Sequence, residues 1–251
     1  MEDMIEEVPR MPLIGDDAPK FKAKTTFGEI DFPGDYKGKW VILFSHSADF
    51  TPVCTTEFIK CATMQKELND LNTELIGLSV DSIYSHIAWL RIIKEKIEYK
   101  GLKNVEIMFP VIEDLGMEIA KKYGMIHPKA SLTREEILEK LQRSEGPIHL
   151  DEINTKTVRA VFIIDPKAKI RAILYYPLSN GRNMDEVKRL LIAMQRSDKE
   201  NIETPENWQP GDDVILATPE SYETAKERVE TEEEGKHCHD WFMCFRNDPQ
   251  N

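Results

Sequence analysis

One cysteine of this chain stands where a buried strand is followed by a helix. The apolar run Trp40–Phe44 predicts the strand, and apolar residues at helical spacing from Phe58 onward predict the helix. Thr51 is the expected N-cap and Pro52 the first helical residue, so Cys54 falls in the first turn. Free backbone N–H groups and the helix dipole there favour the thiolate, the reactive form of cysteine. Cys54 is therefore a candidate nucleophile; the alternative is a buried cysteine that packs as a small apolar residue.

The residues around Cys54 resemble the signature of a known family. Peroxiredoxins carry Pro-x-x-x-Thr/Ser-x-x-Cys after a strand, and this chain has Ser47-x-x-x-Thr51-x-x-Cys54, with serine in the place of the proline that packs over the cysteine and limits water access. The longer string Phe44-Ser-His-Ser-Ala-Asp-Phe-Thr-Pro-Val-Cys-Thr-Thr-Glu57 is similar to the one-cysteine, peroxiredoxin 6-like subgroup, including its archaeal members. The resemblance implies a thiol peroxidase that reduces hydrogen peroxide and organic hydroperoxides at Cys54 and needs no metal or organic cofactor.

Two further residues match the family's catalytic set. Thr51 is expected both to cap the helix and to hold the peroxide beside the thiolate. Arg159 lies in Thr-Val-Arg-Ala-Val-Phe, which matches the family's arginine strand. An arginine near a thiolate lowers the pKa of the thiol and stabilises the charge that develops as the O–O bond breaks. The alternative for Arg159 is a surface arginine on a strand.

Three more side chains are weaker candidates. The resemblance implies that His46 lines the pocket and binds peroxide, although a structural histidine fits the sequence equally well. Arg182, in Gly-Arg-Asn, is a weaker candidate than Arg159 for an active-site arginine, and helix entry or a subunit contact fits it equally well. Glu57, one turn after Cys54, is expected to support the helix or to pair with an active-site arginine.

The remaining cysteines divide into one on the helix and two in the tail. Cys61 follows Cys54 by two helical turns, so it is expected in the core and not as a disulfide partner of Cys54. The tail segment Lys236-His-Cys-His-Asp-Trp-Phe-Met-Cys244 contains Cys238 and Cys244. The redox hypothesis is that a tail thiol attacks the Cys54 sulfenate and forms a disulfide, which a thioredoxin-like or other dithiol reductant then reduces.

Two alternatives for the tail stay open. Cys238 and Cys244 could bind zinc together with His237 and His239, although the spacing of these ligands matches no standard structural zinc site. They could also be two inert thiols among packed aromatic residues.

The elements that must position these residues alternate between strand and helix. Strands are expected at Thr73–Val80, Ile107–Ile112, Val158–Pro166 and Ile170–Tyr176, the last two as a hairpin, and an amphipathic helix is expected after Ser82. This pattern predicts an α/β fold with a sheet covered on both faces. The resemblance makes it a thioredoxin-like core with a central mixed β-sheet flanked by helices and a smaller C-terminal extension.

The expected domains are the core at 12–198, interrupted by an insertion at 127–157, and an extension at 199–251 that packs on a neighbouring subunit. The resemblance implies a homodimer that assembles into a decameric ring. A net charge of −12 over 251 residues argues against nucleic acid and anionic membranes as partners. The acidic start and the lack of a long apolar run predict a cytoplasmic protein. The alternative function is a ring-forming holdase or redox sensor on the same fold.

Overall fold

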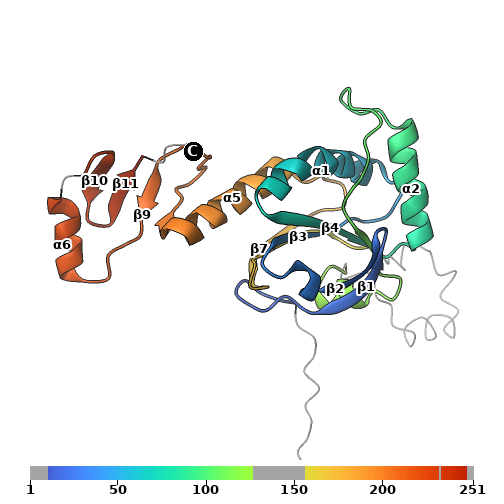
Figure 1. Ribbon diagram of the computed structural model, residues 1–251, viewed down its shortest axis with the longest axis horizontal. Coiled ribbons are helices and arrows are strands. Elements are labelled where there is room, and N and C mark those ends of the chain that lie inside the picture. Colours follow the sequence, from blue (N-terminus) through green and yellow to red (C-terminus); the bar gives the residue numbers. More distant parts are fainter. Residues whose placement is uncertain (1–10, 127–155, 232, 248–251) are drawn as a thin grey trace, which may run out of the picture. The chain divides into compact units, whose positions relative to one another are not determined.

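The computed structural model describes residues 11–126, 156–231 and 233–247 (Figure 1). The chain divides into two compact units, Met1–Arg182 and Asn183–Asn251. The expected insertion lies almost wholly outside the described residues. The expected domain boundary at 198 and the contact of the extension with a neighbouring subunit stay predictions.

The first unit is built on a seven-stranded sheet. Its strands are β1 (Phe21–Thr25), β2 (Gly28–Phe32), β3 (Trp40–Ser45), β4 (Thr73–Ser79), β5 (Val111–Glu113), β6 (Arg159–Ile164) and β7 (Ile170–Tyr176). The order across the sheet is β2-β1-β5-β4-β3-β6-β7. The three central strands β5, β4 and β3 run parallel, and the other neighbours pair antiparallel. The sheet is therefore mixed, as expected.

Both faces of this sheet are covered, because alternate residues of a strand point to opposite faces. On one face Phe44 of β3 packs against Phe58 of α1 (Pro52–Asp70), with ring centroids 5.5 Å apart. Phe58 in turn packs against Trp89 of α2 (Ile83–Lys96), at 4.6 Å, so both helices lie on the same side of the sheet (Figure 1). The opposite face is buried in a cluster that includes Val41, Leu43, Phe21, Phe32, Phe162 and Tyr123, with residues of α3 (Glu118–Lys122). A 3-10 turn, η1 (Gly34–Tyr36), precedes β3.

Two sequence expectations in this unit are wrong in detail. The strand expected at Ile107–Ile112 begins only at Val111, because Pro110 has no N–H to donate to a ladder. In α2 the buried side chains are His86, Trp89 and Ile93, whereas Ile87 is 54% exposed. The apolar residues Ile83, Ile87, Leu90 and Ile93 predict this helix and locate it correctly. Its buried face, however, has His86 and Trp89 in place of Ile87 and Leu90, because a histidine with polar partners inside the protein occupies a core position.

The second unit contains α5 (Met184–Glu200), β8 (Ile202–Glu203), β9 (Val214–Leu216), α6 (Tyr222–Glu230), β10 (Lys236–Asp240) and β11 (Met243–Arg246). Its four strands form a separate sheet in the order β10-β11-β9-β8. Its small core is centred on Trp208, which is buried beside Ala193, Ile202 and Val214. The indole N–H of Trp208 donates to the carbonyl oxygen of Asp212 at 3.0 Å, which satisfies its one polar atom.

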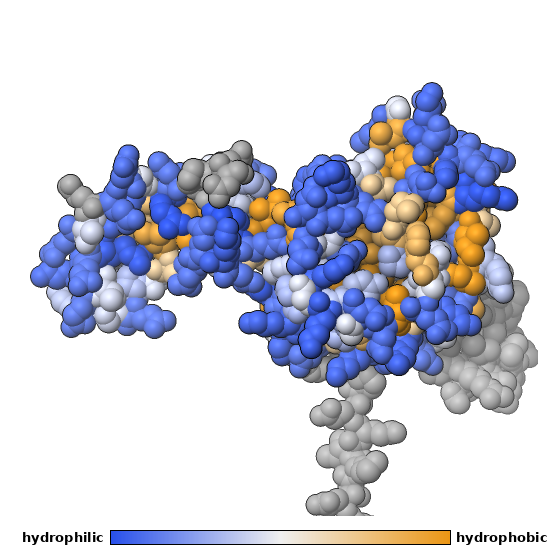
Figure 2. Space-filling model, viewed as in Figure 1, coloured by the Kyte–Doolittle hydropathy of each residue, from blue (hydrophilic) through white to orange (hydrophobic). Residues whose placement is uncertain are grey.

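Hydrophilic residues cover most of the visible face of the molecule in Figure 2, as the 31% charged composition leads us to expect. In the described part of the chain, every helix is too short or too polar to cross a membrane.

Candidate active site

Cys54 lies in the first turn of α1, at the end of the loop that leaves β3. Thr51 is the N-cap residue and Pro52 the first helical residue, as the sequence predicted. The predicted capping bond is wrong, however: the hydroxyl of Thr51 donates to the carbonyl oxygen of Ala48, at 2.8 Å, and makes no bond to a helix N–H. Thr51 therefore closes the loop before the helix and keeps its hydroxyl on the side of Cys54.

The Cys54 sulfur is fully buried yet surrounded by hydrogen-bond donors. Ser47 Oγ lies 3.3 Å from Cys54 Sγ, and a terminal nitrogen of Arg159 donates to the sulfur, also at 3.3 Å. Burial alone would raise the pKa of the Cys54 thiol. The hydrogen bond from Ser47, the Thr51 side chain, the Ala48 backbone and the Arg159 charge together outweigh burial and hold the pKa of Cys54 below its ordinary value. The site therefore favours a thiolate.

A buried carboxylate links two arginines beside the sulfur. Glu57 Oε2 accepts from Arg159 at 2.8 Å and from Arg182 at 2.7 Å. Glu57 Oε1 accepts from the backbone N–H and the Nε of Arg182 at 2.8 and 2.9 Å. Coulombic attraction and hydrogen bonds from the arginines overcome burial and lower the pKa of Glu57. Two cations then face one carboxylate, so an ionised Cys54 supplies the second negative charge and neutralises the cluster.

Arg182 acts as a clamp in this cluster. One of its terminal nitrogens contacts Glu57, and the other donates to the carbonyl oxygens of Ser45 at 2.8 Å and Ala160 at 2.9 Å. These bonds join the end of β3 to the start of β6. Arg159 is fixed from the other side, where its Nε donates to the carbonyl oxygen of Leu178 at 2.9 Å. The structure therefore places both arginines in the site. The surface alternative for Arg159 is wrong, since this residue is 2% exposed.

His46 is fully buried in the loop that carries Ser47 and Thr51. Its Nε2 lies 2.9 Å from Asp49 Oδ1, and the same carboxylate lies 2.8 Å from Nδ1 of His86 on α2. Sequence reasoning did not select Asp49 or His86. The one signal that could have identified His86 is its place on the same face of α2 as Trp89, three residues later.

Of the other three cysteines, one lies in the core and two form a disulfide with each other. Cys61 is buried in the core, as expected, and burial raises the pKa of its thiol to about 12. Cys238 and Cys244 are directly paired across β10 and β11 and are joined by a disulfide with an S–S distance of 2.04 Å. Both sulfurs are bonded to each other in this state, so neither is a thiolate that could bind zinc with His237 and His239.

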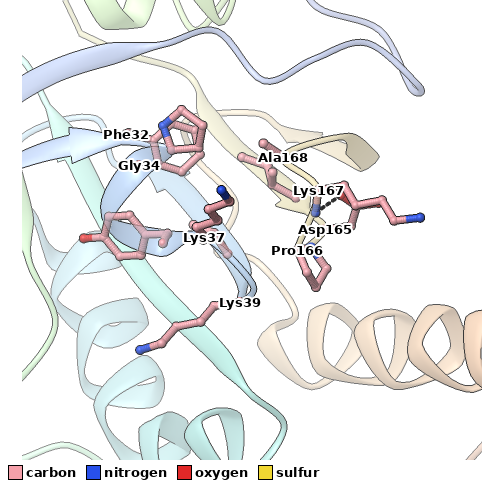
Figure 3. A pocket seen from close by; sticks show the side chains of 12 residues that line it. Phe32, Gly34, Lys37, Lys39, Asp165, Pro166, Lys167 and Ala168 are labelled. Atoms are coloured by element: carbon pink, nitrogen blue, oxygen red, sulfur yellow. Dashed lines mark hydrogen bonds between the residues drawn. The ribbon is translucent and has the colours of Figure 1, made fainter.

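A cavity of about 250 Å³ lies at the other end of the sheet from Cys54 (Figure 3). Its walls come from the start of β3, the end of β6 and the connection to β7, including Tyr36, Lys39, Val41 and Pro166. None of the residues around Cys54 lines it. The buried cluster around Cys54 at the carboxyl end of β3 is therefore separate from this cavity.

Replacing Ser47 by alanine is expected to raise the pKa of Cys54, because the hydroxyl that donates to the thiolate is removed. At pH 7 the rate of alkylation of Cys54 by iodoacetamide should fall about tenfold, the effect of one hydrogen bond to a charged group. The rate of alkylation measured from pH 5 to 10 gives the pKa of Cys54 as the midpoint of its rise with pH. Thr63→Ala removes an exposed hydroxyl from the same helix and is the control. An unchanged midpoint in Ser47→Ala would contradict the role of this hydroxyl.

Comparisons with known proteins agree with this fold. Residues 14–173 match the AhpC/TSA family, and residues 193–232 match the C-terminal domain of 1-Cys peroxiredoxin. A peroxiredoxin of Methanosarcina mazei is 62% identical over 240 residues, which cover 96% of this chain and 100% of the relative. A peroxiredoxin of Aquifex aeolicus is 46% identical over 248 residues, 95% of this chain and 98% of the relative.

Two solved structures are also similar over nearly the whole chain. The yeast mitochondrial 1-Cys peroxiredoxin, described with its thiol-resolving mechanism via glutathione and thioredoxin systems, superposes with a TM-score of 0.75 at 39% identity, covering 95% of this chain and 100% of that one. The C45S mutant of peroxiredoxin 6 of Arenicola marina gives 0.73 at 28% identity, covering 96% of this chain and 100% of that one.

Proposed function

Because this chain belongs to the peroxiredoxins, a family of peroxidase enzymes, and matches the 1-Cys C-terminal domain, we propose that it reduces hydrogen peroxide and small organic hydroperoxides at Cys54. The observation that supports this most directly is the Arg159 nitrogen 3.3 Å from Cys54 Sγ. The same nitrogen is held by Glu57, so the cation is fixed beside the thiolate before the substrate arrives.

The proposed reaction is a single displacement. The Cys54 thiolate attacks the O–H oxygen of the hydroperoxide, an S–O bond forms, and the O–O bond breaks. The leaving oxygen takes a proton from water and departs as water or an alcohol, and Cys54 becomes a sulfenic acid. Arg159 stabilises the negative charge that moves onto the leaving oxygen, and the hydroxyl of Thr51 holds the peroxide in line with the sulfur. His46 is proposed as a further peroxide contact.

For the return to the thiolate we propose that the tail cysteines accept the oxidation. A tail thiolate attacks the sulfur of the Cys54 sulfenic acid, and a disulfide between Cys54 and the tail forms. The displaced hydroxide takes up a proton from solvent and becomes water. The second tail thiol then displaces Cys54 and gives the Cys238–Cys244 disulfide, which the structure contains. A thioredoxin-like dithiol protein would reduce it. The solved yeast relative, whose description names glutathione and thioredoxin systems, supports a thiol reductant of this class. Assembly into dimers and a decameric ring stays a prediction.

Intact mass and non-reducing peptide mapping after one equivalent of hydrogen peroxide test this function, starting from fully reduced protein. We expect the wild type to gain the Cys238–Cys244 disulfide, and Cys238→Ser or Cys244→Ser to trap a Cys54–tail linkage. Cys54→Ser should prevent all of these products. Sulfenic or sulfinic Cys54 without a linkage would mean a one-cysteine mechanism with an external thiol. An unmodified Cys54 would overturn the peroxidase proposal and favour the holdase or sensor alternative.

A further inference from the structure

Three buried polar residues form a connected group around His46, whose ring packs 4.8 Å from that of Phe58, one helical turn after Cys54 on α1. His46 and His86 are fully buried and Asp49 is 6% exposed. Asp49 Oδ1 lies 2.9 Å from His46 Nε2 and 3.0 Å from His86 Nδ1, and Asp49 Oδ2 lies 2.8 Å from the same His86 nitrogen. One carboxylate therefore links a loop histidine to a helix histidine.

The partners of His86 determine its protonation. His86 Nε2 faces the carbonyl oxygen of Ile112 at 3.0 Å, and a carbonyl oxygen only accepts, so this nitrogen carries a proton. On the other side is Asp49. Burial works against its charge, but the hydrogen bonds from both histidines hold the pKa of Asp49 well below its usual range. An ionised carboxylate also only accepts, so His86 Nδ1 carries a proton as well. His86 therefore bridges Asp49 and the carbonyl oxygen of Ile112 through its two ring nitrogens.

The protonation of His46 follows from the same carboxylate. Its Nε2 must donate to Asp49, and burial lowers the pKa of His46, which favours the neutral ring. The single proton of that ring is on Nε2, so Nδ1 is a bare acceptor. Among the described residues, His46 Nδ1 is the buried side-chain nitrogen or oxygen without a hydrogen-bond partner. A buried acceptor left without a donor is costly, and native proteins keep such groups where a ligand completes the bond.

The group also holds the loop that carries the chemistry. The backbone N–H of Asp49 donates to Asp81 Oδ2 at 2.9 Å, so this residue is fixed through both its main chain and its side chain. It stands between Ser47, which contacts the sulfur, and Thr51, which begins the helix. The residue after it, Phe50, has a φ of 57°, a conformation that a bulky side chain adopts only when its surroundings enforce it.

Metal binding is a weaker account of the same residues. Their ligand atoms lie within 4.8 Å of one another, as a metal site would require. Contacts of 2.8–3.0 Å are ordinary hydrogen-bond lengths, however, and His86 uses both ring nitrogens in them. The hydrogen bonds account for His46 Nε2, for both ring nitrogens of His86 and for the Asp49 carboxylate without an ion.

We infer that Asp49 and His86 are positioning residues of the peroxidase reaction, which fix the His46 ring so that Nδ1 accepts the O–H proton of the bound hydroperoxide in a hydrogen bond. The inference rests on the proposed function. The carboxylate sets the tautomer, and the hydrogen bond with His86 helps to keep the carboxylate ionised. A hydroperoxide held at Nδ1 through its O–H presents the oxygen that the thiolate attacks.

The test combines a tautomer measurement with a rate. Protein labelled with ring ¹⁵N-histidine, its His46 signals assigned by loss in His46→Gln, is expected to show the Nε2–H tautomer alone in the wild type. In Asp49→Asn one carboxylate oxygen becomes an NH₂ group, which donates and cannot accept from either ring, and the negative charge is lost, so we expect His46 to populate both tautomers. The rate constant for oxidation of Cys54 by hydrogen peroxide should fall about 10- to 100-fold, the value of a hydrogen bond to a charged group. His86→Gln keeps a donor toward the carbonyl oxygen of Ile112, and it should also lower the rate constant for Cys54 oxidation.

Thr157→Val is the matched control, because Thr157 donates to the backbone carbonyl oxygen of His46 at 2.5 Å and does not contact its ring. Its His46 tautomer should match that of the wild type. Unchanged rates in Asp49→Asn and His86→Gln, or slower rates with a wild-type tautomer, would overturn the inference while a reactive wild type leaves the proposed function intact. A wild-type Cys54 that does not react with peroxide would overturn the proposed function, and this inference with it.

Discussion

Replacing Arg159 by glutamine is expected to slow the oxidation of Cys54 by hydrogen peroxide by about 10²- to 10³-fold at pH 7, the usual loss when one preorganised donor is removed from a reacting centre. The guanidinium acts twice. It donates to Cys54 Sγ at 3.3 Å, which helps to lower the pKa of the thiol, and in the proposed reaction it stabilises the oxygen whose charge grows as the O–O bond breaks.

The effect of Arg159 on the pKa of Cys54 and its effect on the transition state can be separated by measuring the rate constant of Cys54 oxidation as a function of pH. Only the thiolate reacts, so the rate rises with pH through the pKa of Cys54 and then reaches a plateau. In the wild type this midpoint lies below the ordinary value for a thiol, and in Arg159→Gln it should move to higher pH. The loss that remains on the plateau reports transition-state stabilisation alone. Stopped-flow oxidation from pH 5 to 10 measures both.

Arg159→Lys is the matched variant, because it keeps the charge and loses the fork that reaches Leu178, Cys54 and Glu57 together. Its midpoint should stay closer to that of the wild type than the midpoint of Arg159→Gln. A glutamine variant with the wild-type midpoint and plateau would remove Arg159 from the mechanism.

The second large effect concerns stability. Glu57→Gln is expected to lower the free energy of unfolding by about 3–5 kcal/mol at pH 7, the usual cost of removing one partner from a buried ion pair. The amide leaves two buried guanidinium groups with one negative charge, that of the Cys54 thiolate, in this cluster, and it points N–H donors at the donors of Arg182. Because the same arginine holds the ends of β3 and β6, the damage extends into the sheet.

The pH dependence of this loss has a defined sign. The folded pKa of Glu57 is lowered, so its contribution to stability is complete above the ordinary value of 4.5 and is lost as the pH falls through the folded pKa. The difference in the free energy of unfolding between the wild type and Glu57→Gln should therefore become smaller at acid pH. Urea unfolding at pH 7 and pH 4 measures it.

Asp70→Asn, the same acid-to-amide change in an exposed pair on α1, is the control and should leave stability nearly unchanged. A Glu57→Gln protein as stable as this control would show that the buried carboxylate is dispensable.

The sequence determined the features that depend on neighbours along the chain. The strand before the nucleophile, Pro52 at the first helical position and the place of Cys54 in the first turn all follow from local patterns, and all are confirmed. So are the Ser82 cap of α2 and the hairpin of β6 and β7. The motif around Cys54 also indicates the family by itself, because its residues are contiguous along the chain.

The tertiary structure decided which distant polar groups meet. Glu57 and Arg182 are separated by 125 residues, and Asp49 and His86 by 37, so no periodicity links either pair. The bond that Thr51 makes was also beyond the sequence, because a hydroxyl at an N-cap has a choice of acceptors that the loop geometry settles. Buried polar residues take core positions only when folding brings their partners to them, and a pattern of apolar residues carries no record of those partners.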